Sequence, residues 1–226
     1  MTAFSEYTPA LQTKLPNAGT TIFTVMSALA AEKGAVNLGQ GFPDFDCDPR
    51  LLDAVDQAMR TGHNQYPPMA GVAELRQAIA AKVQTLYGAT YNPDTEITVT
   101  AGATQAIFTA IMAVVRPGDD VIVIEPMYDS YLPNIVLAGA NPVCVPMTDD
   151  FTIDWARVQA AVTPRTRAIL VNTPHNPSGR ILRDADLRAL EAIAQAHDLF
   201  VIADEVYEHM VFDLSLIHIS EPTRPY

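Results

Sequence analysis

The sequence predicts an α/β fold, a three-layer sandwich in which helices cover both faces of a mainly parallel sheet. Two observations support this prediction. From residue 96 onward, short apolar runs alternate with longer segments that have the 3.6-residue spacing of helices. The apolar runs, such as "VIVIE" and "RAILVN", are hydrophobic at successive positions, which is typical of strands buried on both faces.

The N-terminal part of the chain is expected to be mostly helical. Each of its three helical segments ends at a glycine, the residue that most often ends a helix in the left-handed conformation. One short apolar run, "AVNL", is expected to be a strand. The predicted helices are residues 21–34, 49–62 and 71–88, and the predicted strand is 35–38.

The C-terminal part is expected to consist of strand–helix units. Its strands are rich in Val and Ile, and each is followed by a segment with helical spacing. The predicted strands are residues 96–100, 121–125, 142–146, 167–172 and 199–205, and the helices between them are 103–115, 131–139, 155–162 and 185–198. Ligands of parallel sheets bind at the carboxyl ends of the strands, so the site is expected there.

The composition limits the classes of function. The chain has 226 residues and a formal net charge of -12, which argues against binding to nucleic acid or to an anionic membrane and favours small-molecule ligands. No signal peptide or membrane-spanning run is recognisable, so a cytoplasmic protein is expected. Cys47 and Cys144 are far apart in the sequence and are expected to be reduced thiols. No histidine has the spacing of a metal site.

One strand end could bind an anion. "ITVTAGATQAI" passes from a strand into a helix through Gly102, Ala103 and Thr104, whose small side chains allow backbone N–H groups at a helix N-terminus to approach a phosphate. An ordinary tight turn explains the glycine equally well.

Two further strand ends carry polar residues. "AILVNTPHNPSGR" has rigid turn chemistry and offers a ligand at least one amide, from Asn172 or Asn176. In "VIADEVY", Asp204 ends an apolar strand and Tyr207 follows about one turn later. A buried carboxylate requires a partner, and the sequence has no lysine or arginine beside Asp204, so a ligand could supply the positive charge.

Six motifs in order resemble the fold type I aminotransferases of class I/II, which depend on pyridoxal 5'-phosphate. They are "LGQGFPDF", "NQYPPMAGVAELR", "AGATQAI", "EPMYDSY", "NTPHNPSG" and "ADEVY". The first is most similar to the branch that contains kynurenine, glutamine and methionine aminotransferases. The resemblance implies an N-terminal arm and part of a small domain in residues 1–40 and an incomplete cofactor-binding large domain in residues 41–213.

The resemblance also implies roles for individual residues. Asp204 would pair with the protonated pyridine nitrogen of the cofactor, and Tyr128 would stack on the ring. Asn176 and Tyr207 would hydrogen-bond the ring's 3-oxygen. Gly102, Ala103 and Thr104 would hold the phosphate, and Tyr66 would reach the phosphate of the neighbouring subunit in a homodimer. Gly41 and Asn176 would contact the substrate carboxylate.

The catalytic lysine of the family has no counterpart here. In the family, the Schiff-base lysine follows the "DEVY" segment in a Ser/Thr-x-x-Lys pattern. The three lysines of this sequence, Lys14, Lys33 and Lys82, all precede the phosphate turn, and none fits the pattern. Residues 214–226, "LSLIHISEPTRPY", depart from the family and resemble translated adapter DNA joined to a broken gene, so a truncated chain with a non-native tail, inactive alone, is expected.

Two classes of function remain open. The first is transamination by the parent enzyme between a 2-oxo acid and an amino acid of the methionine, aromatic, kynurenine or glutamine type, with beta-lyase chemistry on cysteine S-conjugates or cystathionine as an alternative. The second is a non-catalytic truncated paralogue that acts as a dimer partner. Coding sequence beyond Asp213 would separate the two classes.

Overall fold

The computed structural model describes residues 12–16, 19–41 and 45–210. The chain divides into two compact units, which are described separately. Among the described residues, the first unit comprises 12–16, 19 and 107–208, and the second comprises 20–41, 45–106 and 209–210. The predicted tail at 214–226 lies outside the described residues.

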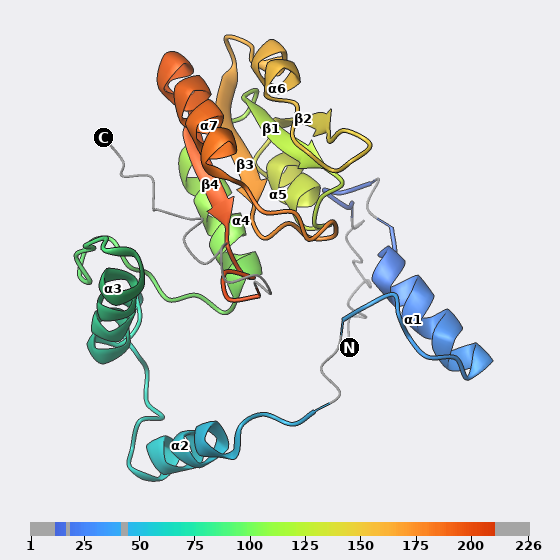
Figure 1. Cartoon of the computed structure of the whole chain (residues 1–226). Helices are drawn as coiled ribbons and strands as arrows, with labels where there is room; N and C mark the ends of the chain where they lie inside the picture. The colour runs from blue at the N-terminus through green and yellow to red at the C-terminus, as the bar shows by residue number, and fades with distance from the viewer. Residues whose placement is uncertain (1–11, 17–18, 42–44, 211–226) are drawn as a thin grey trace, which may run out of the picture. The chain divides into compact units, whose positions relative to one another are not determined.

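The first unit contains a parallel sheet of four strands in the order β2-β1-β3-β4 (Figure 1). The strands are β1 (Asp120–Glu125), β2 (Asn141–Pro146), β3 (Thr166–Asn172) and β4 (Phe200–Asp204). All three pairings are parallel, and the register places Asn172 opposite Asp204. The carboxyl ends of β3 and β4 therefore lie side by side.

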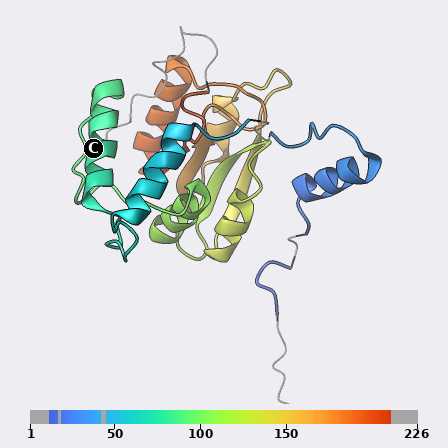
Figure 2. The same ribbon diagram turned by 90° about the horizontal axis from the view of Figure 1, so that it is seen from below.

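Helices cover both faces of this sheet, as Figure 2 shows from below. On one face, α4 (Ala103–Val114), in its part from Ile107 onward, and α5 (Tyr131–Leu137) pack on Val121, Val123 and Leu170. On the other face, α6 (Trp155–Ala161) and α7 (Asp184–His197) pack on Ile122, Ile169 and Val171. Successive strand residues point to opposite faces, so the continuous apolar runs fill two cores. The predicted three-layer α/β fold is confirmed.

The helices in the described part of the second unit are α1 (Ile22–Lys33), α2 (Pro49–Arg60) and α3 (Ala73–Tyr87). The side chains of Thr21 and Asp48 cap the first backbone N–H groups of α1 and α2. Gly34 and Gly88 follow α1 and α3 with φ of 60° and 70°, a left-handed conformation that glycine adopts without strain.

Two predicted strands are wrong. Residues 35–38 and 96–100 form no strand. A strand requires a partner along its length, and a single bond such as that from the Val99 N–H to the Ala70 carbonyl, 2.9 Å, does not supply one. Within the described residues, no helix is both long and apolar enough to cross a membrane.

Candidate active site

The carboxyl end of β4 presents a buried carboxylate. Asp204 is 8% exposed, although a charged side chain is rarely buried without a partner. Its Oδ2 accepts a hydrogen bond of 2.6 Å from the Tyr131 hydroxyl, and its Oδ1 accepts one of 3.2 Å from the Val206 N–H. In the described part of the chain, no lysine, arginine or histidine lies within ion-pair distance of Asp204.

The end of β3 is bonded to the same place. The Asn172 side-chain amide donates to the Asp204 carbonyl at 2.8 Å, and the Thr173 N–H donates to that carbonyl at 3.0 Å. The Asn172 Oδ1 accepts the Asn176 N–H at 2.6 Å. Asn172 thus connects β4 to the turn that carries Asn176, so Asn176 and Asp204 are positioned by one residue.

His175 fixes this turn from the other side. It is 7% exposed; its Nε2 lies 2.9 Å from the Pro126 carbonyl and its Nδ1 lies 2.7 Å from the Ser178 Oγ. A carbonyl can only accept, so Nε2 carries the proton of a neutral ring. Burial lowers the pKa of His175, which favours this neutral form. His175 therefore joins the turn to the segment that leads from β1 to Tyr128.

Two tyrosines before and at the start of α5 face one another. The rings of Tyr128 and Tyr131 meet edge to face, with centroids 5.8 Å apart and an interplanar angle of 77°. Tyr131 is 2% exposed. Burial, and then its bond to Asp204, raises the pKa of the Tyr131 hydroxyl, so the hydroxyl is a proton donor at neutral pH.

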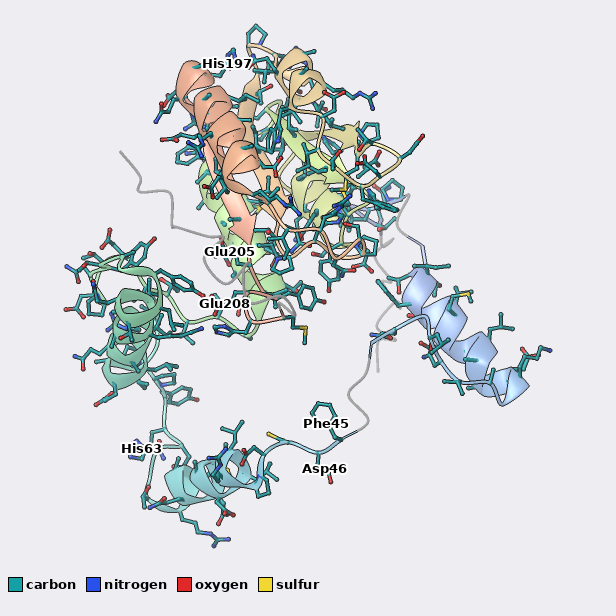
Figure 3. The ribbon with its side chains drawn as sticks, viewed as in Figure 1. Phe45, Asp46, His63, His197, Glu205 and Glu208 are labelled. Atoms are coloured by element: carbon teal, nitrogen blue, oxygen red, sulfur yellow. The ribbon has the colours of Figure 1, made fainter. Side chains whose placement is uncertain are left out.

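More acidic and aromatic side chains follow β4. Tyr207 is half-buried three residues beyond Asp204. Burial, together with the charges of Glu208 and Asp204, raises the pKa of Glu205. Figure 3 shows Glu205 and Glu208 beyond the carboxyl end of β4, whereas His197 lies at the opposite end of the sheet, at the end of α7. This end of the first unit is negatively charged and is suited to a cation.

The other predicted site residues belong to the second unit. Gly102 has φ of 85° and directly precedes α4. The first two residues of α4, Ala103 and Thr104, are exposed, and their N–H groups have no carbonyl partner within the helix. Tyr66 and Gly41 are exposed. No group of three or more potential metal ligands occurs among the described residues.

The sequence did not predict the bonds that Tyr131 and Asn172 make to Asp204. Tyr131 is three positions after Tyr128, and only the tertiary fold shows that its hydroxyl turns toward β4, 73 residues away. Asn172 is opposite Asp204 in the register, so the pairing of the two strand ends was the signal that could have found it.

The chain is similar to proteins of one known family. Residues 33–222 match the family model described as aminotransferase class I and II. The chain is 53% identical over 197 residues to a probable N-succinyldiaminopimelate aminotransferase of Mycobacterium tuberculosis. The aligned region covers 86% of this chain and 50% of that protein. It is 50% identical over 202 residues to methionine aminotransferase of Escherichia coli, with coverage of 89% and 52%.

Solved structures of the same two kinds of enzyme are also similar. The N-succinyldiaminopimelate aminotransferase from Mycobacterium tuberculosis superposes with a TM-score of 0.86 at 51% identity, over 91% of this chain and 54% of that one. The methionine aminotransferase YbdL from Escherichia coli gives 0.89 at 46% identity, over 95% and 58%. The chain spans about half the length of the curated relatives it matches. It belongs to the class I and II aminotransferases, the fold type I enzymes that depend on pyridoxal 5'-phosphate.

Proposed function

We propose that the chain is the cofactor-binding part of an aminotransferase that transfers an amino group between an amino acid and a 2-oxo acid. One observation carries the proposal. Asp204 is buried at the carboxyl end of a parallel strand, and no cationic side chain of the described residues pairs with it. An unpaired buried charge is costly, so this site fits a ligand that brings its own positive charge.

Pyridoxal phosphate fits that requirement. Its pyridine nitrogen is cationic when protonated, and the protonated ring withdraws electrons from the carbon that loses a proton during transamination. The part of Asp204 is to hold that nitrogen in its protonated form through an ion pair. Tyr128 would contact the ring face, and Asn176 and Tyr207 would donate hydrogen bonds to its 3-oxygen.

Phosphate and substrate contacts are assigned to the second unit. The unpaired N–H groups at the start of α4 and the Thr104 hydroxyl suit a phosphate, because helix N-termini favour anions. Gly102 provides the left-handed turn that opens this helix. Gly41, with Asn176, would contact the substrate carboxylate, and Tyr66 would reach the phosphate of the second subunit of a homodimer.

The amino donor is proposed only as a class. One group of relatives is named for N-succinyldiaminopimelate, another for methionine, and a mouse relative at 36% identity for kynurenine. We retain the methionine, aromatic, kynurenine and glutamine types. N-succinyldiaminopimelate, the substrate in the name of the first relative, is a further candidate, because that relative has the highest sequence identity of these three.

The lysines provide the first experiment. Because Lys14, Lys33 and Lys82 all precede α4, we propose that none of them bonds the cofactor aldehyde and that this chain binds the cofactor reversibly. Borohydride treatment of the chain saturated with pyridoxal phosphate should then leave no stoichiometric covalent adduct, as judged by intact mass. One adduct per chain, mapped to a single one of these lysines, would contradict the proposal.

The second experiment concerns the parent protein. The source DNA should be read through the codon for Asp213 and beyond. The proposal predicts a frame that continues into a Ser/Thr-x-x-Lys segment. The longer product, supplied with pyridoxal phosphate, should transfer the amino group of an amino acid donor to a 2-oxo acid acceptor and leave the donor's own 2-oxo acid. A longer product that contains this lysine and shows no transamination with any of the donor classes above would refute the proposed activity.

A further inference from the structure

We propose that Tyr131 is a positioning residue for Asp204: its hydroxyl, 2.6 Å from Oδ2, orients the carboxylate toward the ring nitrogen of the cofactor. This inference rests on the proposed function, because it assumes that Asp204 meets a pyridine ring. Tyr131 is proposed to act through Asp204.

The geometry leaves the carboxylate few ways to move. Oδ1 is held by the Val206 N–H and Oδ2 by Tyr131, and the backbone carbonyl of Asp204 accepts from two groups at the end of β3. A carboxylate oxygen has about two acceptor sites, so each oxygen of Asp204 can still accept one further bond. The hydroxyl therefore sets the direction of the remaining acceptor sites without occupying them.

Tyr131 is itself held rigidly. It is 2% exposed, it packs with Ile107, Ile111 and Ile135 in the core beside the sheet, and its ring meets Tyr128 edge to face. The same side chain thus contacts both the carboxylate proposed to pair with the ring nitrogen and the tyrosine proposed to contact the ring face. Its hydroxyl stays protonated at neutral pH, since burial raises its pKa.

Among the described residues, no other titratable side chain donates a hydrogen bond to the Asp204 carboxylate. The titratable side chains that interact with Asp204 or Tyr131 are Tyr128, Tyr207 and Glu205, with Glu208 next to Glu205. A carboxylate cannot donate when ionised, and in the described part of the chain neither of the other two tyrosines has a hydrogen bond to Asp204. The Tyr131 bond is therefore the specific device that orients Asp204.

The experiment compares two ligands that need no lysine. They are pyridoxamine 5'-phosphate and its 1-deaza analogue, in which carbon replaces the ring nitrogen, and both are titrated into the whole chain by calorimetry. Tyr131→Phe removes the hydroxyl and keeps the ring. It should weaken binding of the pyridine ligand by about tenfold and leave the affinity for the deaza analogue unchanged. A role limited to packing would weaken both ligands equally, and that result would overturn the inference.

A matched control exists at the other end of the sheet. The Thr163 hydroxyl donates at 2.7 Å to Oδ2 of Asp120, a carboxylate that is 2% exposed and lies at the start of β1. Thr163→Val removes an equivalent bond in the same unit and should leave the affinities for both ligands unchanged. The ratio of the affinities for the pyridine ligand and the deaza analogue is compared with that of the wild type. If Thr163→Val changes this ratio as much as Tyr131→Phe does, the inference is overturned.

Asp204→Asn separates failure of this inference from failure of the proposed function. If the wild-type chain does not discriminate between the ligands, or if Asp204→Asn binds the pyridine ligand as tightly as wild type, the proposed function and the inference both fail. If Asp204→Asn loses discrimination and a folded Tyr131→Phe keeps it, the inference alone fails.

A measurement without loss of the hydroxyl covers the case in which Tyr131→Phe does not fold. Placing 3-fluorotyrosine at position 131 keeps the bond to Asp204. The fluorine resonance should shift when pyridoxamine 5'-phosphate binds and stay in place when the deaza analogue binds. Equal shifts with the two ligands, or no shift with either, would overturn the inference.

Discussion

Buried carboxylates occupy opposite ends of the sheet, and their partners differ. Asp120, at the start of β1, accepts from Thr163, Asn141 and Arg165. Asp204, at the end of β4, has one hydroxyl and one backbone N–H. A carboxylate with a full set of protein partners stabilises the fold, whereas one with open acceptor sites is available to a ligand.

The Asp120 cluster leads to a prediction about acid stability. The Thr163 hydroxyl is the largest cause that lowers the pKa of Asp120. The stabilisation is therefore present above about pH 4 and is lost as the pH falls through the lowered value. Thr163→Val should reduce the free energy of unfolding at pH 7 by about 1–3 kcal/mol. It should also make the free energy of unfolding fall less steeply as the pH is lowered. Urea unfolding from pH 7 to pH 3 measures both effects, and an unchanged slope would contradict the assignment.

His175 leads to a second prediction, at higher pH. Burial lowers its pKa, so the stabilisation by the neutral ring is complete above about pH 6.5 and is lost as the pH falls from there toward the lowered value. His175→Gln, which can still donate to the Pro126 carbonyl, should remove this pH dependence. His175→Ala should remove it too and also lower the free energy of unfolding by about 1–3 kcal/mol. Urea midpoints at pH 7.5 and pH 5.5 provide the comparison, and an undiminished difference in His175→Gln would refute it.

Among the elements, α6 and α7 are joined by one carboxylate. Asp186 accepts the Arg183 N–H at 2.9 Å, which caps the start of α7, and the Trp155 Nε1–H at 2.8 Å, which binds α6. Asp186, which accepts both bonds, lies in the first turn of α7, where the helix dipole also favours a negative charge. The layer on this face of the sheet therefore depends on Asp186.

Substitution of Asp186 tests that dependence. Asp186→Ala should lower the free energy of unfolding by about 1–2 kcal/mol and shift the emission of Trp155, the chain's only tryptophan. Asp184→Ala is the matched control, because Asp184 lies in the same first turn and its ion pair, with exposed Arg188 at 3.5 Å, lies on the surface. It should change neither quantity by much. Equal losses in the two variants would contradict a specific role for Asp186.

Prediction from the sequence succeeded for elements with strong hydrophobic periodicity. It failed for segments that form a strand only if a neighbouring strand is there to pair with them. The helices that the structure describes, and the strands of the sheet, lie where the apolar spacing placed them. Residues 96–100 have the β-branched composition of a strand, but composition does not supply a neighbouring strand. Asp204 could be found because it ends an apolar run without a local cation, whereas Tyr131 could not, because its contact spans 73 residues.

At the scale of the whole molecule, family membership and the parallel sheet are shown, and the division of labour between the two units is a proposal. The first unit holds the residues proposed for the cofactor ring, and the second holds those proposed for phosphate, substrate carboxylate and partner subunit. The domain boundary expected near residue 40 stays a prediction. Because the chain covers about half of its relatives, the complete activity is assigned to the parent protein.

The central claim is that Asp204 holds a protonated pyridine ring, and NMR of the ring nitrogen tests it most directly. Pyridoxamine 5'-phosphate labelled with ¹⁵N at the ring nitrogen would be bound to the wild-type chain and to Asp204→Asn. The account predicts the chemical shift of a protonated ring in the wild type, maintained at alkaline pH where the unbound ligand has lost its proton, and a neutral ring in the variant. A neutral ring in the bound wild type, or the same shift in both proteins, would contradict it.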